Sequence, residues 1–215
     1  VYYESHGEGM PVFSIHGFGV DHRAMKSCLE PIFKGRPGYR RIYFDMPGMG
    51  LTKASEPLKT ADDLLDVIIA LIDSLIPDGH FLVAGSSFGA LLERGVMYRL
   101  PERIDGALLL APVMVSERSK RELPPKKVLH KDERLLSAQE ADKRKTFELM
   151  TTVQDERTWK RYEEYILPAL EMADTAFSGR IQQSGFQLSF DVDHIKPLER
   201  PVLLMTGRQD TAVGY

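Results

Sequence analysis

The sequence predicts an α/β fold in which a mostly parallel sheet is flanked by helices. Short and almost entirely apolar runs alternate along the chain with segments whose apolar residues recur at helical spacing. Strands that are apolar on both faces are typical of parallel sheets covered by helices on each side. The chain has 215 residues, which suffices for one domain of this kind with an insertion.

Five apolar runs are the expected parallel strands, and helices are expected to connect them. The strands are residues 11–15, 41–45, 81–84, 106–110 and 201–205. One helix is expected over residues 21–33, and another is expected to begin at Thr60, whose hydroxyl can cap it. A third helix should run from about Phe88 to Leu100, because Pro101 stops it.

Residues 113–198 break this alternation and predict a helical insertion without a clear strand. The segment Ser137-Ala138-Gln139-Glu140 matches a capping box and predicts the start of a helix. Asp155 is expected to cap a second helix, which Pro168 ends or kinks and whose aromatic face is Trp159, Tyr162 and Tyr165. The expected organisation is a core over 1–112, a cap over 113–198 and a resumed core over 199–215.

Composition narrows the function classes. A net charge of −3 at pH 7 argues against a nucleic-acid partner, because such proteins carry a basic stripe. Cys28 is the only cysteine, so no internal disulfide can form, which favours a cytoplasmic location. No apolar run approaches the roughly 20 residues that span a bilayer. No metal or organic cofactor is expected, since no cluster has metal-ligand spacing, and the sequence leaves the oligomeric state open.

A serine in a glycine-flanked turn is the strongest chemical signal. Gly85-Ser86-Ser87-Phe88-Gly89 matches G-x-S-x-G and lies between an apolar strand and a helix. In that motif the serine occupies a sharp, strained turn with its hydroxyl exposed, and the flanking positions must be small. These demands identify Ser87 rather than Ser86 as the expected nucleophile. The alternative is a glycine-rich turn with ordinary serines.

Two backbone N–H groups are expected to form an oxyanion hole beside Ser87. Phe88 follows the nucleophile directly and can supply one donor, while His16-Gly17-Phe18-Gly19 follows the first parallel strand. A glycine-flanked residue in that early loop can supply the second donor, and Phe18 is the best placed. His16 is expected to be structural, because it precedes the loop that faces the substrate.

Asp210 is the expected acid of a catalytic triad. It follows the last apolar strand in the segment Gly207-Arg208-Gln209-Asp210, and catalytic groups gather at the carboxyl ends of parallel strands. It also follows Ser87 in the chain, as the order Ser, Asp, His requires. The other candidate acid, Asp45, begins the turn Asp45-Met46-Pro47-Gly48-Met49-Gly50 and is expected to cap that turn instead.

These four motifs together resemble the α/β-hydrolase fold family, in particular its capped serine hydrolases such as esterases and carbon–carbon bond hydrolases. The resemblance implies a histidine that follows the acid after another helix and strand. It also places Val1-Tyr2-Tyr3-Glu4 at the family's second strand, so we expect the sequence to lack both ends of the complete protein. None of the histidines occupies the implied position: His6, His16, His22, His80, His130 and His194.

The function expected from these residues is hydrolysis of a small ester, amide or related acyl compound by a Ser–His–Asp triad. A carbon–carbon bond hydrolase with the same triad is one alternative. A non-catalytic ligand-binding protein is another, because one fold hosts many functions. The motifs do not identify the substrate, because the shape of the pocket between cap and core decides it.

Overall fold

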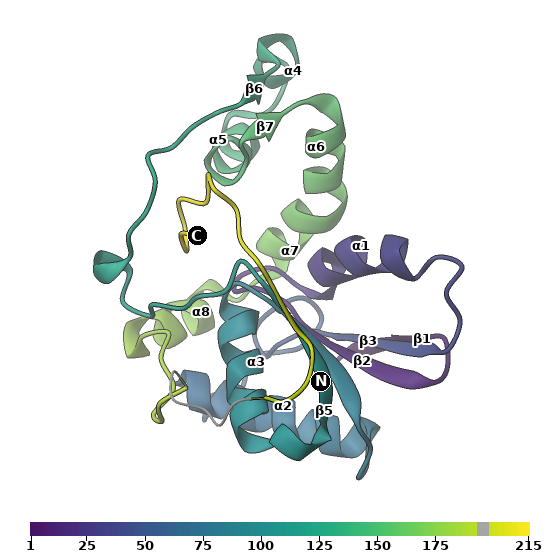
Figure 1. The fold of residues 1–215 in the computed structure, drawn as a ribbon. Coiled ribbons are helices and arrows are strands. Elements are labelled where there is room, and N and C mark those ends of the chain that lie inside the picture. The colour runs from purple at the N-terminus through teal and green to yellow at the C-terminus, as the bar shows by residue number, and fades with distance from the viewer. Residues whose placement is uncertain (193–197) are drawn as a thin grey trace.

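A six-stranded sheet forms the centre of the structure, a computed structural model that describes residues 1–192 and 198–215 (Figure 1). The strand order is β1-β3-β2-β4-β5-β8, and every neighbouring pair is parallel except β1 with β3. The five expected parallel strands are therefore present. The bounds are β1 Tyr3–His6, β2 Met10–Ile15, β3 Tyr39–Phe44, β4 Phe81–Ser86, β5 Ile104–Leu110 and β8 Val202–Met205.

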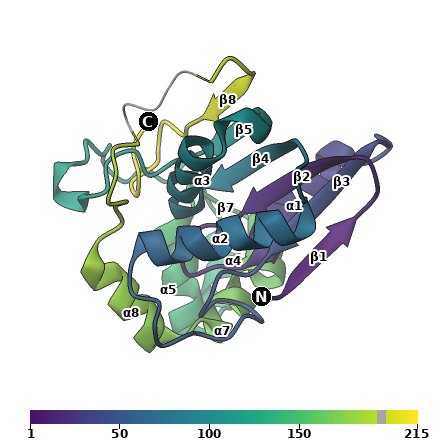
Figure 2. The ribbon, with the colours of Figure 1, turned by 90° about the horizontal axis from the view of Figure 1, so that it is seen from below.

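Helices cover both faces of this sheet. Helices α2 (Ala61–Leu75) and α3 (Phe88–Arg99) pack together on one face (Figure 2), and α1 (His22–Phe33) packs on the other. Successive strand residues alternate between these two cores, as the pleat requires. In β4, for example, Val83 belongs to the core under α2 and α3, while Ala84 belongs to the core under α1. None of the helices in the described ranges is both long and apolar enough to cross a membrane.

Side-chain caps fix where two of these helices begin. The Asp21 carboxylate accepts a hydrogen bond of 3.0 Å from the N–H of Arg23 and starts α1. Thr60 and Asp63 form a reciprocal capping box at the start of α2. The expected cap at Thr60 is confirmed, and the periodic apolar residues that follow it bury one face of α2.

The inserted segment is largely helical and lies beyond the carboxyl ends of the strands (Figure 1). It also contains a two-residue parallel pair, β6 (His130–Lys131) with β7 (Val153–Gln154). Its expected final part includes residues 193–197, with His194, and these lie outside the described residues. The helices are α4 Glu133–Ser137, α5 Ala141–Met150, α6 Glu156–Arg161, a π-helical stretch Tyr162–Ile166, α7 Leu167–Met172 and α8 Thr175–Ser184.

Two expectations for this segment were wrong. The segment is not free of strands, since β6 and β7 pair, although each has only two residues. Ser137 does not start a helix but ends α4, where its hydroxyl donates to the carbonyl of Arg134 at 3.0 Å. The reason is an earlier cap, because the Asp132 carboxylate accepts from the N–H of Leu135 and starts α4 upstream of Ser137.

A small core of its own holds most of the inserted helices together. Leu136, Phe147, Trp159 and Tyr162 are buried against one another, with Phe147 and Trp159 edge to face at 4.9 Å between centroids. Pro168 lies in the first turn of α7, just after the π-helical stretch. Because proline has no N–H to donate, regular α-helical hydrogen bonding is interrupted there, and the wider π turn lies directly before it. Helix α8 behaves differently, because its Phe177 is buried in the main core.

Strand β8 departs from the expected burial on both faces. Its four side chains are 44–57% exposed. β8 is the edge strand of the sheet and pairs with β5 alone, and the described residues leave its apolar side chains largely open. The expectation holds for the interior strands, because they have neighbours on both edges and helices on both faces.

The capping box gives a direct test of how α2 is held. Thr60→Ala removes the acceptor for the N–H of Asp63 and should lower the free energy of unfolding by about 1 kcal/mol. Urea denaturation monitored by circular dichroism measures this change. Ser55→Ala is the matched control, because Ser55 is exposed in the preceding loop, and a loss as large as that of Thr60→Ala would contradict the capping role.

Candidate active site

Ser87 occupies a strained turn between β4 and α3. Its backbone angles are φ 55° and ψ −118°, in the region that non-glycine residues rarely adopt. Two hydrogen bonds secure the turn to the end of β5: the N–H of Ser87 donates to Leu110 at 3.0 Å, and Val113 donates to the carbonyl of Ser87 at 3.1 Å. This is the strand–turn–helix geometry expected for the serine of a G-x-S-x-G motif.

Close backbone packing explains the two glycines that flank this turn. A Cβ atom on Gly85 would lie 2.7 Å from the carbonyl oxygen of Gly89, and one on Gly89 would lie 2.3 Å from that of His16. These neighbours are backbone atoms, which cannot move aside as a flexible side chain would. A side chain at either position would therefore force α3 away from β2 and β4.

The two expected oxyanion donors come from different elements, Phe88 from the helix that follows Ser87 and Phe18 from the loop after β2. Phe88 is the first residue of α3, where helix geometry provides no partner for an N–H. Phe18 lies in the turn after β2, and no described residue accepts a hydrogen bond from its N–H. The rings of Phe18 and Phe88 meet edge to face at 5.4 Å, and both also contact Phe186. Phe186 follows the inserted helices and has no sequence pattern that could have identified it.

A cavity of about 420 Å³ opens at Ser87 between the core and the inserted helices. Its lining is mostly apolar, and it includes Phe18 from the expected oxyanion loop. Helix α1 contributes residues whose role the sequence did not indicate, and the inserted segment, which was expected to cover the pocket, contributes others, including Tyr162 and Tyr165 of its expected aromatic face. These contributions are Ala24, Met25, Ser27 and Cys28 from α1, and Met150, Thr151, Thr158, Arg161, Tyr162, Tyr165 and Ile166 from the insertion.

Asp210 lies at the same edge of the sheet as Ser87 but in a neighbouring cavity. Ser87 follows β4 and Asp210 follows β8, and both strands run parallel to β5 between them. One carboxylate oxygen of Asp210 accepts from the N–H groups of Ala212 and Val213 at 2.8 and 2.9 Å. The cavity at Asp210 has about 490 Å³, and Met150 lines both cavities.

None of the five described histidines lines the cavity at Ser87. His16 is fully buried, where it donates from Nδ1 to the carbonyl of Gly17 and accepts at Nε2 from Met46. Burial lowers the pKa of His16, and these two bonds fix it as a neutral structural residue, as expected. The other four pair with acids or lie on the surface: His6 with Glu4, His22 with Asp45, His80 with Asp105, and exposed His130.

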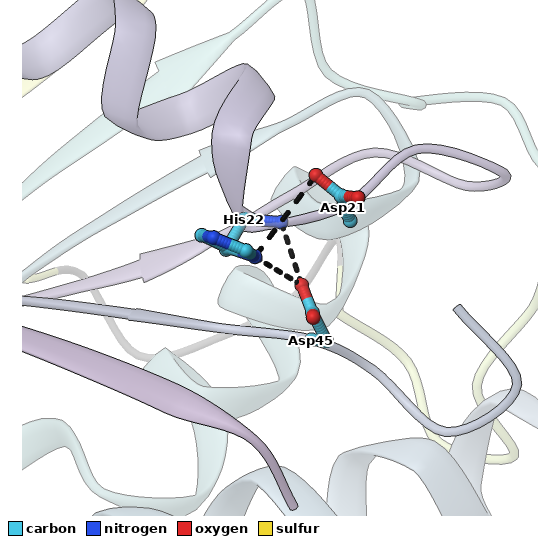
Figure 3. A group of neighbouring side chains, drawn as sticks. All are labelled: Asp21, His22 and Asp45. Atoms are coloured by element: carbon cyan, nitrogen blue, oxygen red, sulfur yellow. Dashed lines mark hydrogen bonds and ion pairs between the residues drawn. The ribbon is translucent and has the colours of Figure 1, made fainter. Parts of the chain in front are cut away.

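A buried ionic network joins the end of β3 to the start of α1 (Figure 3). Asp45 accepts from Nδ1 and the N–H of His22 at 2.7 and 2.8 Å, and from the N–H of Leu51 at 2.8 Å. Burial alone would raise the pKa of Asp45 and lower that of His22. Their hydrogen bonds and opposite charges outweigh burial, so the pKa of Asp45 lies below its ordinary value and that of His22 above.

Together with Asp21, the side chains of His22 and Asp45 form a group, among the described residues, whose geometry could hold a metal ion. The ligand atoms of Asp21, His22 and Asp45 lie within 4.8 Å of one another. Each is already engaged, however, since Asp21 caps α1 and pairs with Arg23 while Asp45 binds His22 and its own turn. The network therefore joins the end of β3 to the start of α1, and Asp45 caps its turn as expected.

A second buried acid lies beneath the Ser87 turn. Glu93 of α3 is fully buried, and neither carboxyl oxygen has a well-formed hydrogen bond among the described residues. Burial raises its pKa well above the ordinary value, and the N–H groups of Gly85 and Leu108 oppose this only in part. The Glu93 carboxyl therefore holds its proton to a higher pH than an ordinary glutamate does, and it packs against Gly85 of β4.

Comparison with known proteins gives a family match over almost the whole chain. The model of the "Alpha/beta hydrolase family" matches residues 12–214. A solved alpha/beta superfamily hydrolase from Oenococcus oeni superposes with a TM-score of 0.90 at 27% identity, covering 99% of this chain and 79% of that one. A meta-cleavage product hydrolase from Pseudomonas fluorescens gives 0.66 at 26% identity, covering 99% and 77%.

A curated relative is similar over about half of the chain. The pimeloyl-[acyl-carrier protein] methyl ester esterase of Legionella pneumophila is 32% identical over 104 residues. The match covers 48% of this chain and 38% of that protein. The chain thus spans about two fifths of the length of this relative.

The ionisation of Glu93 predicts a pH-dependent stability. A carboxyl whose pKa is raised in the fold holds a proton that the unfolded chain loses above about pH 4.5. Between that pH and the raised pKa of the folded protein, the wild-type protein should lose about 1.4 kcal/mol of unfolding free energy per pH unit relative to Glu93→Gln. Urea denaturation of both proteins from pH 5 to pH 8 measures the difference, and a constant difference would show that Glu93 is ionised in the fold.

The raised pKa of His22 predicts a second pH effect. His22 binds its proton more tightly in the fold, so its contribution is complete below about pH 6.5 and is lost as pH rises through the folded pKa. His22→Asn keeps a donor near Asp45 but does not titrate. The stability advantage of the wild-type protein over this variant should therefore shrink from pH 5.5 to pH 9 in urea denaturation, and an advantage that grows over this range would contradict the assignment.

Proposed function

Because the chain belongs to the alpha/beta hydrolase family, we propose that it is a serine hydrolase that cleaves a small acyl substrate, with Ser87 as the nucleophile. The strained Ser87 turn beside an apolar cavity carries this proposal. The similarity to the methyl ester esterase of Legionella pneumophila, over about half of the chain, supports an ester substrate. The single cysteine favours a cytoplasmic location.

The proposed reaction proceeds through an acyl-enzyme. The Ser87 hydroxyl passes its proton to a histidine and its oxygen attacks the substrate carbonyl carbon, which forms a tetrahedral intermediate. The N–H groups of Phe18 and Phe88 hold the negative oxygen of that intermediate. The leaving group departs with the proton from the histidine. A water molecule then gives a proton to the histidine and attacks the acyl carbon, and the acid product is released as the Ser87 oxygen takes the proton back.

The proposed base is a histidine from outside the described residues, because the five described histidines are engaged elsewhere or distant from the cavity. Asp210 is the proposed acid that orients this histidine. Its second carboxylate oxygen accepts no hydrogen bond from a described residue, so it can receive the imidazole N–H. The position of Asp210 after β8 agrees with this role, since Ser87 also lies at the carboxyl edge of the sheet.

Residues 113–198 are the proposed cap over the active site, and 1–112 with 199–215 are the proposed core. The insertion contributes seven of the residues that line the cavity at Ser87, so its side chains shape the acyl pocket. Carbon–carbon bond hydrolysis with the same residues is a second candidate. The 26% identity to a meta-cleavage product hydrolase over 99% of this chain favours it.

The test of the proposal is Ser87→Ala in the complete gene product. Loss of the nucleophile should lower kcat toward p-nitrophenyl acyl esters at least roughly ten-thousand-fold. The release of p-nitrophenolate measures the rate, and circular dichroism verifies the fold. Ser86→Ala is the matched control, because Ser86 lines the same cavity but precedes the strained turn. Comparable losses in both variants, or activity that survives Ser87→Ala, would contradict Ser87 as the nucleophile.

A further inference from the structure

One charged side chain lines the cavity at Ser87. Among the described lining residues it is Arg161, the last residue of α6. Its guanidinium lies over the ring of Tyr165, 5.5 Å from the centroid. It also makes long hydrogen bonds of 3.3 and 3.4 Å to the carbonyl and hydroxyl oxygens of Ser27 on α1. Arg161 thus links the inserted helices to the core at the edge of the cavity.

The charge of Arg161 is not neutralised within the described residues, where no carboxylate lies at ion-pair distance from it. Three other cations that line the adjoining outer groove are neutralised: Arg23 by Asp21, Lys26 by Glu4, and Arg41 by Glu30. Lys34 also lines this groove, where it is exposed and makes no ion pair with a described residue. The guanidinium offers five N–H donors in a planar fork, and the two bonds to Ser27 come from one nitrogen. Arg161 therefore retains donors for an anion.

The position of Arg161 suits a group at the mouth of the cavity. Arg161 and Tyr165 line both the cavity at Ser87 and the outer groove, so they form the boundary between the two spaces. The stacked Tyr165 ring and Ser27 restrict the guanidinium before a ligand arrives, which reduces the entropy lost on binding. The remaining lining is mostly apolar, so an aliphatic chain can extend from this mouth toward Ser87.

We propose that Arg161 binds a carboxylate of the substrate, and that the substrate is an acyl ester whose second, ionised carboxylate lies remote from the scissile carbonyl. This inference rests on the proposed function of Ser87 for the identity of the scissile end. Arginine is well matched to a carboxylate, because two parallel N–H donors meet its two oxygens. An apolar spacer between the two carbonyl groups matches the lining between Ser87 and Arg161.

The experiment compares two ligands that differ in one charge, monomethyl adipate and dimethyl adipate. Both are titrated by calorimetry into the complete protein carrying Ser87→Ala, so that neither is consumed and binding is measured apart from catalysis. Monomethyl adipate should bind at least roughly tenfold more tightly, as expected for a charge-assisted pair. The preference should weaken from about 50 mM to about 500 mM sodium chloride, because Arg161 is accessible to ions.

Variants at Arg161 then locate the preference. Arg161→Gln in the same background should abolish it with little change for dimethyl adipate, and Arg161→Lys should retain part of it, because a single ammonium lacks the fork. Arg157→Gln is the matched control, since Arg157 is an exposed arginine of the same helix that does not line the cavity. Thermal melting verifies folding. If Arg161→Gln is unfolded, the preference for monomethyl adipate is measured instead in Arg161→Lys and across the salt series.

Several outcomes would overturn the inference. These are equal binding of the two ligands, no binding of either, and a preference that survives Arg161→Gln, which would place the carboxylate on the N–H groups near Ser87. An equal loss for both ligands in Arg161→Gln would assign Arg161 a packing role and also overturn it. Ester hydrolysis that survives Ser87→Ala, together with a carboxylate preference that depends on Arg161, would overturn the proposed nucleophile alone.

Discussion

Helix α3 approaches β2 and β4 so closely that one methyl group would not fit at Gly85 or Gly89. At Gly89 the atoms in the way are backbone atoms, including the carbonyl oxygens of Ile15 and His16, and at Gly85 they are backbone atoms of α3 together with the Glu93 carboxyl group. This contact determines the entry angle of α3, and the entry angle in turn forces Ser87 into its positive φ of 55°. The hydroxyl of Ser87, the free N–H of Phe88 and the loop that carries Phe18 are all placed by this one approach.

Two buried acids, Asp45 and Glu93, differ in whether a cationic side chain lies beside them. Asp45 and His22 meet at 2.7 Å and are stabilised in their ionised forms, while no described cation forms an ion pair with Glu93 and burial raises its pKa. A neutral Glu93 costs far less to bury than a carboxylate would. The raised pKa favours the uncharged form of Glu93, and in the proposed reaction an uncharged acid beneath Ser87 would repel a developing negative oxygen less than a carboxylate would.

The sequence predicted the parts of the fold that local chemistry determines. Thr60 and Asp155 cap helices as expected, since a capping side chain needs only its own backbone two or three residues onward. The predicted helix start at Ser137 was wrong, because Asp132 begins a helix upstream and Ser137 lies at the end of that helix. Phe186 and the α1 residues of the cavity could not be found, because their roles depend on which segments the fold brings together.

Family membership does not identify the substrate, because the two walls of the cavity come from different parts of the structure. The turn at Ser87 and the loop at Phe18 belong to the sheet, and backbone packing holds them in place. The opposite wall comes from helices with a separate small core of Leu136, Phe147, Trp159 and Tyr162, so side chains there can change without disturbing the turn. Arg161 belongs to that wall, and in the proposed complex a substrate carboxylate supplies the partner that no described residue provides. In the proposed reaction, residues next to the sheet break the bond, while side chains of the inserted helices recognise the molecule that carries it.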